Sequence, residues 1–244
     1  MAVKRRVGYL PEQPCFYDHL TAEELLVYFG GLFGVDAAER RARATRLLDQ
    51  VGIGAERRLQ LRKYSKGMLQ RVGLAQAILN DPEVLFLDEP MSGLDPLGRR
   101  DVRALILDLR KRGCTIFFSS HILSDAEALC DRVAVLASGR LVAQGRVAEL
   151  VEFEIKGWEL IVSGVDASAL ARLGVQPVKV TEIAGSRYAL ELPGGIAPDR
   201  LLSELTAAGG TLVSLNPIRE TLEDFFVKQV SASQVDSQQS TVDR

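Results

Sequence analysis

Residues 15–80 carry apolar side chains at the spacing of amphipathic helices, with charged side chains between them. Thr21 begins a capping-box sequence, so we expect a helix to start there and to end near Gly30. A second helical stretch follows over Ala37–Val51, with a row of arginines that we interpret as a solvated face. This part of the chain is therefore predicted to be mostly helical.

Short, almost wholly apolar runs alternate with amphipathic helices in the next part of the chain. Buried parallel strands and their crossover helices have this pattern. The runs expected to form strands are Val84–Leu87, Thr115–Ser119 and Arg132–Leu136, together with an opening strand over Arg6–Leu10. A Ser138-Gly139 turn then predicts a hairpin that returns over 140–144. We expect an α/β domain built on a parallel sheet.

A different pattern occupies the last third of the chain. The predicted order is strand, helix, strand, strand, helix, strand, which is the split β-α-β arrangement of ferredoxin-like domains. The predicted elements are Trp158–Val162, Ala167–Leu173, Pro177–Ile183, Arg187–Leu192, Pro198–Ala208 and Thr211–Leu215. A last amphipathic helix is expected over Glu220–Val230. We therefore predict a first domain over 1–150, a small α+β domain over 151–230 and a disordered tail over 231–244.

Composition excludes several classes of function. Hydrophobic residues make up 47% of the 244 residues and charged residues 25%, which is typical of soluble globular domains. The 30 lysines and arginines against 32 acidic residues leave no basic excess for a nucleic-acid partner. No apolar run approaches the roughly 18 residues of a membrane span, and no signal peptide is found. Three cysteines without metal-type spacing favour reduced thiols, as in a cytosol.

The strand over Val84–Leu87 ends in two adjacent carboxylates, Asp88 and Glu89. Open α/β sheets bind ligands at the carboxyl ends of their strands, which is where this pair is expected. Asp88 is of the residue type that holds Mg²⁺, and Glu89 can polarise a water as a general base. The pair therefore suits phosphoryl transfer to water. The alternative interpretation is an acidic pair that merely begins a loop.

Four further segments surround the acidic pair in a fixed order. They are Gln13, Tyr64-Ser65-Lys66-Gly67-Met68-Leu69-Gln70-Arg71, Ser92-Gly93-Leu94-Asp95-Pro96 and Ser119-Ser120-His121. In this order the chain resembles the ATP-binding subunit of an ABC transporter. The segments match the Q-loop, the signature, the D-loop and the switch histidine of that family, and Asp88-Glu89 matches its Walker B. The resemblance covers nearly all of the chain.

The resemblance implies a role for each matched side chain. It makes Glu89 and His121 the catalytic residues, with His121 on the γ-phosphate and the attacking water. It assigns Asp88 and Gln13 to Mg²⁺. The residues that it implies for ATP binding are Gln13, Ser65, Lys66, Gly67 and Asp95. Ser65 opens a helix, and free N–H groups at a helix N-terminus suit the γ-phosphate of ATP bound by the opposite subunit.

By resemblance, the chain is expected to be an ATPase that couples ATP hydrolysis to export across a membrane. Lys66 and Met68 depart from the commonest signature and resemble the ABC-2 type exporter branch, as does the small C-terminal domain. The implied partners are a transmembrane permease and a second ATP-binding subunit in a head-to-tail dimer, without nucleic acid. The implied location is cytoplasmic, at the inner face of the cell membrane.

The family's phosphate-binding loop, Gly-x-x-x-x-Gly-Lys-[Ser/Thr] or Walker A, is absent from the sequence, because no lysine of the chain follows a glycine. We therefore expect an incomplete P-loop NTPase core, truncated at its N-terminal side, with an unpaired sheet edge and no ATPase activity on its own.

Two alternatives remain open. One is a nucleotide-incompetent partner or regulatory module that donates Ser65 and Gly67 in trans. The other is a soluble ABC ATPase outside transport. That second class would need a long coiled coil between Gln13 and the signature, and the sequence has no sustained heptads there.

Overall fold

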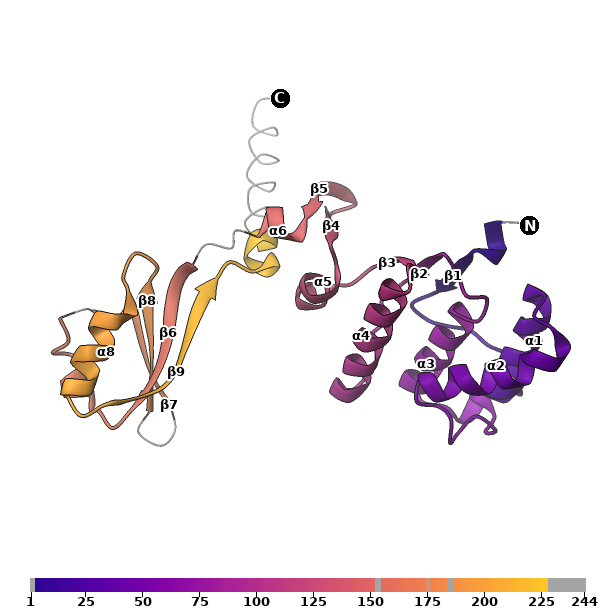
Figure 1. Ribbon diagram of the computed structural model, residues 1–244, viewed down its shortest axis with the longest axis horizontal. Coiled ribbons are helices and arrows are strands. Elements are labelled where there is room, and N and C mark those ends of the chain that lie inside the picture. Colours follow the sequence, from indigo (N-terminus) through magenta and orange to yellow (C-terminus); the bar gives the residue numbers. More distant parts are fainter. Residues whose placement is uncertain (1–2, 152–154, 175, 184–186, 228–244) are drawn as a thin grey trace, which may run out of the picture. The chain divides into compact units, whose positions relative to one another are not determined.

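The computed structural model describes residues 3–151, 155–174, 176–183 and 187–227. The chain divides into two compact units, Met1–Leu129 and Cys130–Arg244, each of which is described by itself (Figure 1). The predicted domain boundary at residue 150 stays a prediction. The predicted tail over 231–244 lies outside the described residues.

A three-stranded parallel sheet with the order β1-β2-β3 forms the centre of the first unit. Its strands are β1 Val7–Leu10, β2 Val84–Leu87 and β3 Thr115–Phe118. The register pairs Leu10 with Leu87 and Leu87 with Phe118, so the three strands end at one edge. Segments that lie far apart in the sequence are therefore brought together at that edge.

Helices α3, Lys66–Ala77, and α4, Pro96–Lys111, lie on the same side of this sheet (Figure 1). The packing of α3 on β1 is close, because a Cβ on Gly8 would lie only 2.0 Å from the carbonyl oxygen of Ala77. Glycine permits such an approach between two backbones. The leucines beneath α3, such as Leu10, are completely buried. The sheet is thus held firmly against the signature helix.

The opposite face of the sheet carries one aromatic side chain from each strand. Tyr9, Phe86 and Phe117 are paired in register, and the rings of Phe86 and Phe117 lie 5.9 Å apart. All three are at least 41% exposed, so the described residues leave this face open. Among the same residues, β1 and β3 each pair on one side only.

Two further helices, α1 and α2, pack on each other and on α3. Their bounds are Ala22–Phe33 and Ala37–Gln50, and short 3-10 helices span Val3–Arg5 and Leu61–Lys63. The capping box is confirmed, since the Thr21 hydroxyl accepts the Glu24 N–H and the Glu24 carboxylate accepts the Thr21 N–H. The predicted end near Gly30 is wrong. The helix continues to Phe33 and is capped by Gly34, whose φ of +83° is the left-handed conformation that glycine adopts without a steric penalty.

The strand β4, Arg132–Ala137, corrects another prediction. We expected this run in the parallel sheet, but β4 pairs antiparallel with β5, Arg140–Arg146, in a two-stranded sheet of the second unit. The hairpin predicted from the Ser138-Gly139 turn is confirmed, since these two residues join β4 to β5 with φ of +50° and +74°, the geometry of a tight hairpin turn. A short apolar run has the same pattern in either kind of strand, so periodicity alone could not separate the two.

The rest of the second unit has the predicted β-α-β-β-α-β order. After α6, Val147–Leu150, the elements are β6 Ile155–Ser163, α7 Ala167–Leu170, β7 Lys179–Ile183, β8 Arg187–Pro193, α8 Pro198–Ala207 and β9 Thr211–Arg219. The antiparallel sheet has the order β7-β8-β6-β9, so β8 lies between β6 and β7 as in a split β-α-β unit. Residues 222–227 are helical, and the remainder of the last predicted helix is outside the described residues.

Two smaller expectations can also be compared with the structure. Cys15 and Cys114 are free cysteines in the structure, and the predicted reduced state of the thiols stays a prediction. Burial, with a smaller contribution from the charge of Asp81, raises the pKa of the Cys114 thiol above its ordinary value. Within the described part of the chain, no helix combines the length and the apolar character needed to cross a bilayer.

Candidate active site

The acidic pair Asp88 and Glu89 leaves β2 at the edge where all three parallel strands end. The Asp88 N–H donates to the Leu10 carbonyl at 2.8 Å, so the pairing of β2 with β1 continues into the pair. Both side chains are half-buried. The sheet therefore places the two carboxylates at its ligand-binding edge, which is where the sequence predicts them.

Ser119, which follows β3, connects the two acids. Its hydroxyl donates to Asp88 Oδ1 at 2.6 Å and accepts the Glu89 N–H at 2.9 Å. The sequence indicates no separate role for Ser119, because its contact with the acidic pair depends on β2 and β3 being neighbours in the folded sheet. Its position at the end of an apolar strand, two residues before His121, was the available indication.

His121 lies directly against one of the acids. Its Nδ1 is 2.8 Å from Glu89 Oε2, and its side chain is 72% exposed against 20% for that of Glu89. A neutral imidazole can donate from one ring nitrogen and accept at the other. The pair can therefore share a proton between Glu89 Oε2 and His121 Nδ1, and it leaves the second ring nitrogen for another partner.

The backbone of Glu89 is strained. Its φ is +46°, a left-handed conformation that is uncommon for a residue with a Cβ and costs free energy unless its surroundings enforce it. The Glu89 carbonyl accepts the Ser92 N–H at 3.0 Å and the Gln70 Nε2 at 3.2 Å. Strain of this kind concentrates at functional sites, so the geometry agrees with a functional role for Glu89.

The N-terminus of α3 carries the predicted signature residues. Ser65 caps the helix with its hydroxyl and is exposed. A Cβ on Gly67 would lie 3.1 Å from the Gly93 carbonyl oxygen, and Lys66 Nζ lies 3.4 Å from Ser92 Oγ. The start of α3 is therefore in direct contact with the turn that follows the acidic pair.

A cavity of about 360 Å³ lies beside this helix start. Ser65, Gly67 and Asp95 all line it, whereas Asp88 and Glu89 do not. Asp95 also caps α4, since its Oδ1 accepts the N–H of the residue three positions later at 2.8 Å. The structure thus brings Asp88, Glu89 and His121 together at the carboxyl edge of the sheet, and Ser65, Gly67 and Asp95 together at the start of α3.

The donor set at the sheet edge suits Mg²⁺. This ion prefers oxygen ligands and is usually held by one or two carboxylates together with waters and substrate phosphates. Asp88 supplies such a carboxylate, and Gln13 is exposed in the segment after β1, which ends at the same edge. No group of three or more His, Cys, Asp or Glu side chains that could hold a metal is found among the described residues. The roles of Asp88 and Gln13 as Mg²⁺ ligands stay predictions.

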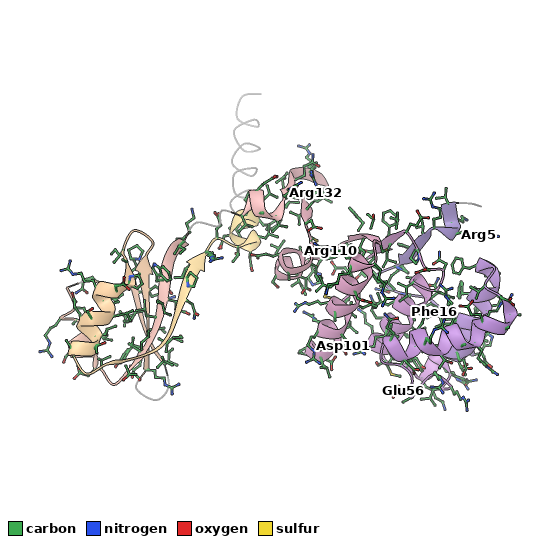
Figure 2. The ribbon with its side chains drawn as sticks, viewed as in Figure 1. Arg5, Phe16, Glu56, Asp101, Arg110 and Arg132 are labelled. Carbon is green, nitrogen blue, oxygen red and sulfur yellow. The ribbon has the colours of Figure 1, made fainter. Side chains whose placement is uncertain are left out.

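Tyr64, just before the helix cap, is buried and ties the signature to the loop after α2. Its hydroxyl donates to the Glu56 carbonyl at 2.7 Å, and Glu56 is labelled in Figure 2. Burial, with the charge of Glu56 adding to it, raises the pKa of Tyr64 from 10.0 to about 12. The neutral hydroxyl is therefore the form that the fold favours.

A titration can test this assignment. We expect ultraviolet absorbance to show one tyrosine that ionises near pH 12, and we expect Tyr64→Phe to remove that component. Because folding raises this pKa, the contribution to stability is complete below pH 10.0 and is lost as the pH rises through about 12. At pH 8, Tyr64→Phe should cost about 1 kcal/mol in urea unfolding followed by circular dichroism. The exposed Tyr17→Phe is the control, and a high-pH component that survives in Tyr64→Phe would contradict the assignment.

Comparisons with known proteins agree with these motifs. A family profile described as "ABC transporter" matches residues 1–92. The chain is 46% identical over 229 residues to an uncharacterized ABC transporter ATP-binding protein, sll0415, of Synechocystis sp., and this match covers 93% of the chain and 63% of that relative. It is 34% identical over 225 residues to the Nod factor export ATP-binding protein I of Burkholderia orbicola, covering 92% of the chain and 72% of that relative.

A solved structure is also similar. The structure described as that of an ATP binding subunit of an ABC transporter matches with a TM-score of 0.56 and 33% identity, over 60% of this chain and 61% of that one. The α/β fold expected from the sequence is thereby confirmed. The chain spans slightly less than two thirds of the length of the cyanobacterial relative.

Proposed function

Because the chain belongs to the family of ABC transporter ATP-binding proteins, we propose that it is the ATP-hydrolysing subunit of an ABC exporter. The observation that carries this proposal is the 2.8 Å contact of Glu89 Oε2 with His121 Nδ1, beside Asp88 at the carboxyl edge of the sheet. The export direction is supported by the name of the Burkholderia relative. A transmembrane permease would be the partner that carries the substrate.

The proposed chemistry assigns one task to each side chain of the edge cluster. Glu89 accepts a proton from the attacking water as the general base. His121 would act as the imidazolium, in which both ring nitrogens are donors: Nδ1 donates to Glu89 Oε2 and the other ring nitrogen donates to the γ-phosphate. Asp88, oriented by Ser119, and Gln13 would hold Mg²⁺. When bound with ATP, this ion neutralises negative charge on the phosphates.

The second cluster would act on a different nucleotide. Ser65 and Gly67 lie at the N-terminus of a 12-residue helix, where free N–H groups and the helix dipole favour a phosphate. They line a cavity that Asp88 and Glu89 do not line, which supports two separate phosphate sites on one chain. We assign the α3 site to ATP held by a second subunit in a head-to-tail dimer, with Lys66 and Asp95 beside it.

A second candidate function is supported by a specific observation. The signature helix start is complete in this chain, because Ser65 caps a 12-residue helix and Gly67 lies against the Gly93 carbonyl. A chain of this kind could donate Ser65 and Gly67 to the ATP site of a complete subunit without hydrolysing ATP at its own acidic pair.

Two ATPase assays separate the candidates. In the first assay, the P-loop segment of a full-length relative is fused to the N-terminal side of the chain, and phosphate release is measured. If the chain is an ATP-hydrolysing exporter subunit, the fusion should hydrolyse ATP, and Glu89→Gln should abolish this hydrolysis. In the second, the unextended chain is mixed with a full-length relative whose own signature serine has been replaced. The donor function predicts restored turnover that Ser65→Ala lowers and that Glu89→Gln leaves unchanged. The absence of turnover in both assays would contradict both functions.

A further inference from the structure

We propose that Gln70 is a positioning residue for Glu89, and that its side-chain amide fixes the backbone of the general base from the signature helix. The bond in question runs from Gln70 Nε2 on α3 to the Glu89 carbonyl at 3.2 Å. The proposal rests on the proposed role of Glu89 as general base. It goes beyond that role, because it assigns the placement of the base to a residue of a different element.

Gln70 is a polar residue buried in the core. Its side chain is 0% exposed, and its Oε1 is a buried acceptor without a hydrogen-bond partner among the described residues. Burying an amide oxygen without a partner costs free energy, so an apolar side chain of the same size would serve the core better. The packing of α3 therefore does not account for an amide at this position. What the amide supplies is the donor that reaches Glu89.

The Gln70 amide holds a strained backbone. Glu89 has a φ of +46°, and such strain persists only where several contacts enforce it. Its N–H is held by Ser119 Oγ, and its carbonyl by the Ser92 N–H and by Gln70 Nε2. These bonds orient the peptide groups on both sides of the Glu89 Cα. The side chain then leaves the backbone in the direction that brings its Oε2 to 2.8 Å from His121 Nδ1.

Gln70 lies on the helix that begins at the signature. The same helix starts at Ser65, so one rigid element bears both the predicted phosphate site and the amide that holds Glu89. The contacts of Gly67 with Gly93 and of Lys66 with Ser92 connect the start of α3 to the same turn. A shift of α3 would therefore be transmitted to the carbonyl of Glu89.

Hydrogen exchange on the 244-residue chain tests the positioning directly, without any nucleotide. Gln70→Met removes the donor and keeps a similar volume, and Gln76→Met on the same helix is the matched control, since Gln76 is half-buried and has no part in the site. We expect the amides of Glu89 and Ser92 to exchange about tenfold faster in Gln70→Met alone. Exchange in the rest of α3 and in α4 should stay unchanged. Equal acceleration throughout α3, or no acceleration at Glu89, would overturn the proposal.

The ATPase assay of the chain joined to a P-loop segment supplies a second readout. Gln70→Met should lower kcat about tenfold and leave KM within about twofold, because positioning of the base acts in the transition state. If Gln70→Met fails to fold, Gln70→Leu replaces it in both measurements. If Glu89→Gln leaves turnover intact while Gln70→Met still accelerates exchange at Glu89, the proposed function fails and the positioning stands. Unchanged kcat in Gln70→Met, together with a loss in Glu89→Gln, would contradict a positioning role.

Discussion

Glu89→Gln is expected to lower the kcat for ATP hydrolysis about 10²- to 10⁴-fold in the chain joined to a P-loop segment, because a carboxamide cannot accept the proton of the attacking water. The change conserves the shape of the side chain, and the amide oxygen can still accept a hydrogen bond from His121 Nδ1. KM should therefore stay within about twofold, since ATP binding does not depend on the proton acceptor. Phosphate release measured over a range of ATP concentrations gives both constants.

The same strand provides the control for this prediction. Glu83 precedes β2 at its other end, is exposed and pairs with Arg6, so Glu83→Gln removes a carboxylate of the same type far from the carboxyl edge. We expect Glu83→Gln to leave kcat unchanged. Similar losses in both variants would mean a general effect of charge on β2, and retained turnover in Glu89→Gln would remove Glu89 from the catalytic role.

Arg103→Leu is expected to destabilise the first unit by about 3 kcal/mol, because it leaves the carboxylate of Asp125 buried without its counter-charge. Asp125 lies on α5, Leu123–Leu129, and is 0% exposed. Its Oδ1 accepts from Arg103 Nε on α4 at 2.9 Å, and its Oδ2 is buried without a hydrogen-bond partner among the described residues. Trp158, the single tryptophan, lies in the second unit, so unfolding of the first unit by urea is best followed by circular dichroism.

The last turn of α4 offers a matched control. Arg112 pairs with Asp108 in the same way, but both side chains are exposed. Exposed pairs contribute about 0–1 kcal/mol, so Arg112→Leu should change the free energy of unfolding by no more than that. The double variant Arg103→Leu with Asp125→Leu should recover most of the lost free energy of unfolding, since it buries no charge. Equal effects of Arg103→Leu and Arg112→Leu would contradict the importance of burial at Asp125.

The Arg103 and Asp125 pair also bears on the candidate site. Helix α5 begins two residues after His121. The ion pair between α4 and α5 therefore fixes the position of the backbone that follows His121. We therefore expect Arg103→Leu to affect turnover through the position of His121 as well as through stability. Turnover measured well below the melting temperature of the variant separates these two effects.

Short-range features of this protein could be predicted from its sequence. The capping box at Thr21, the strand over Val84–Leu87 and the β-α-β-β-α-β order of the last third depend on periodicity and on residues a few positions apart. The acidic pair after β2 follows from the same local pattern. Predictions failed where the local pattern is ambiguous. The strand β4 was correctly predicted to form a hairpin but wrongly placed in the parallel sheet, and α1 ends at Phe33 rather than near Gly30.

The sequence by itself determined the secondary structure, the order of the motifs and the residue types that could carry the chemistry. Only the tertiary structure decided which of these side chains meet. The contacts of Ser119 with both acids, of His121 with Glu89 and of Gln70 with the Glu89 carbonyl join residues 19 to 32 positions apart. Such contacts depend on strand adjacency, register and helix packing, which are fixed by the burial of the whole core and leave no periodic trace in the chain.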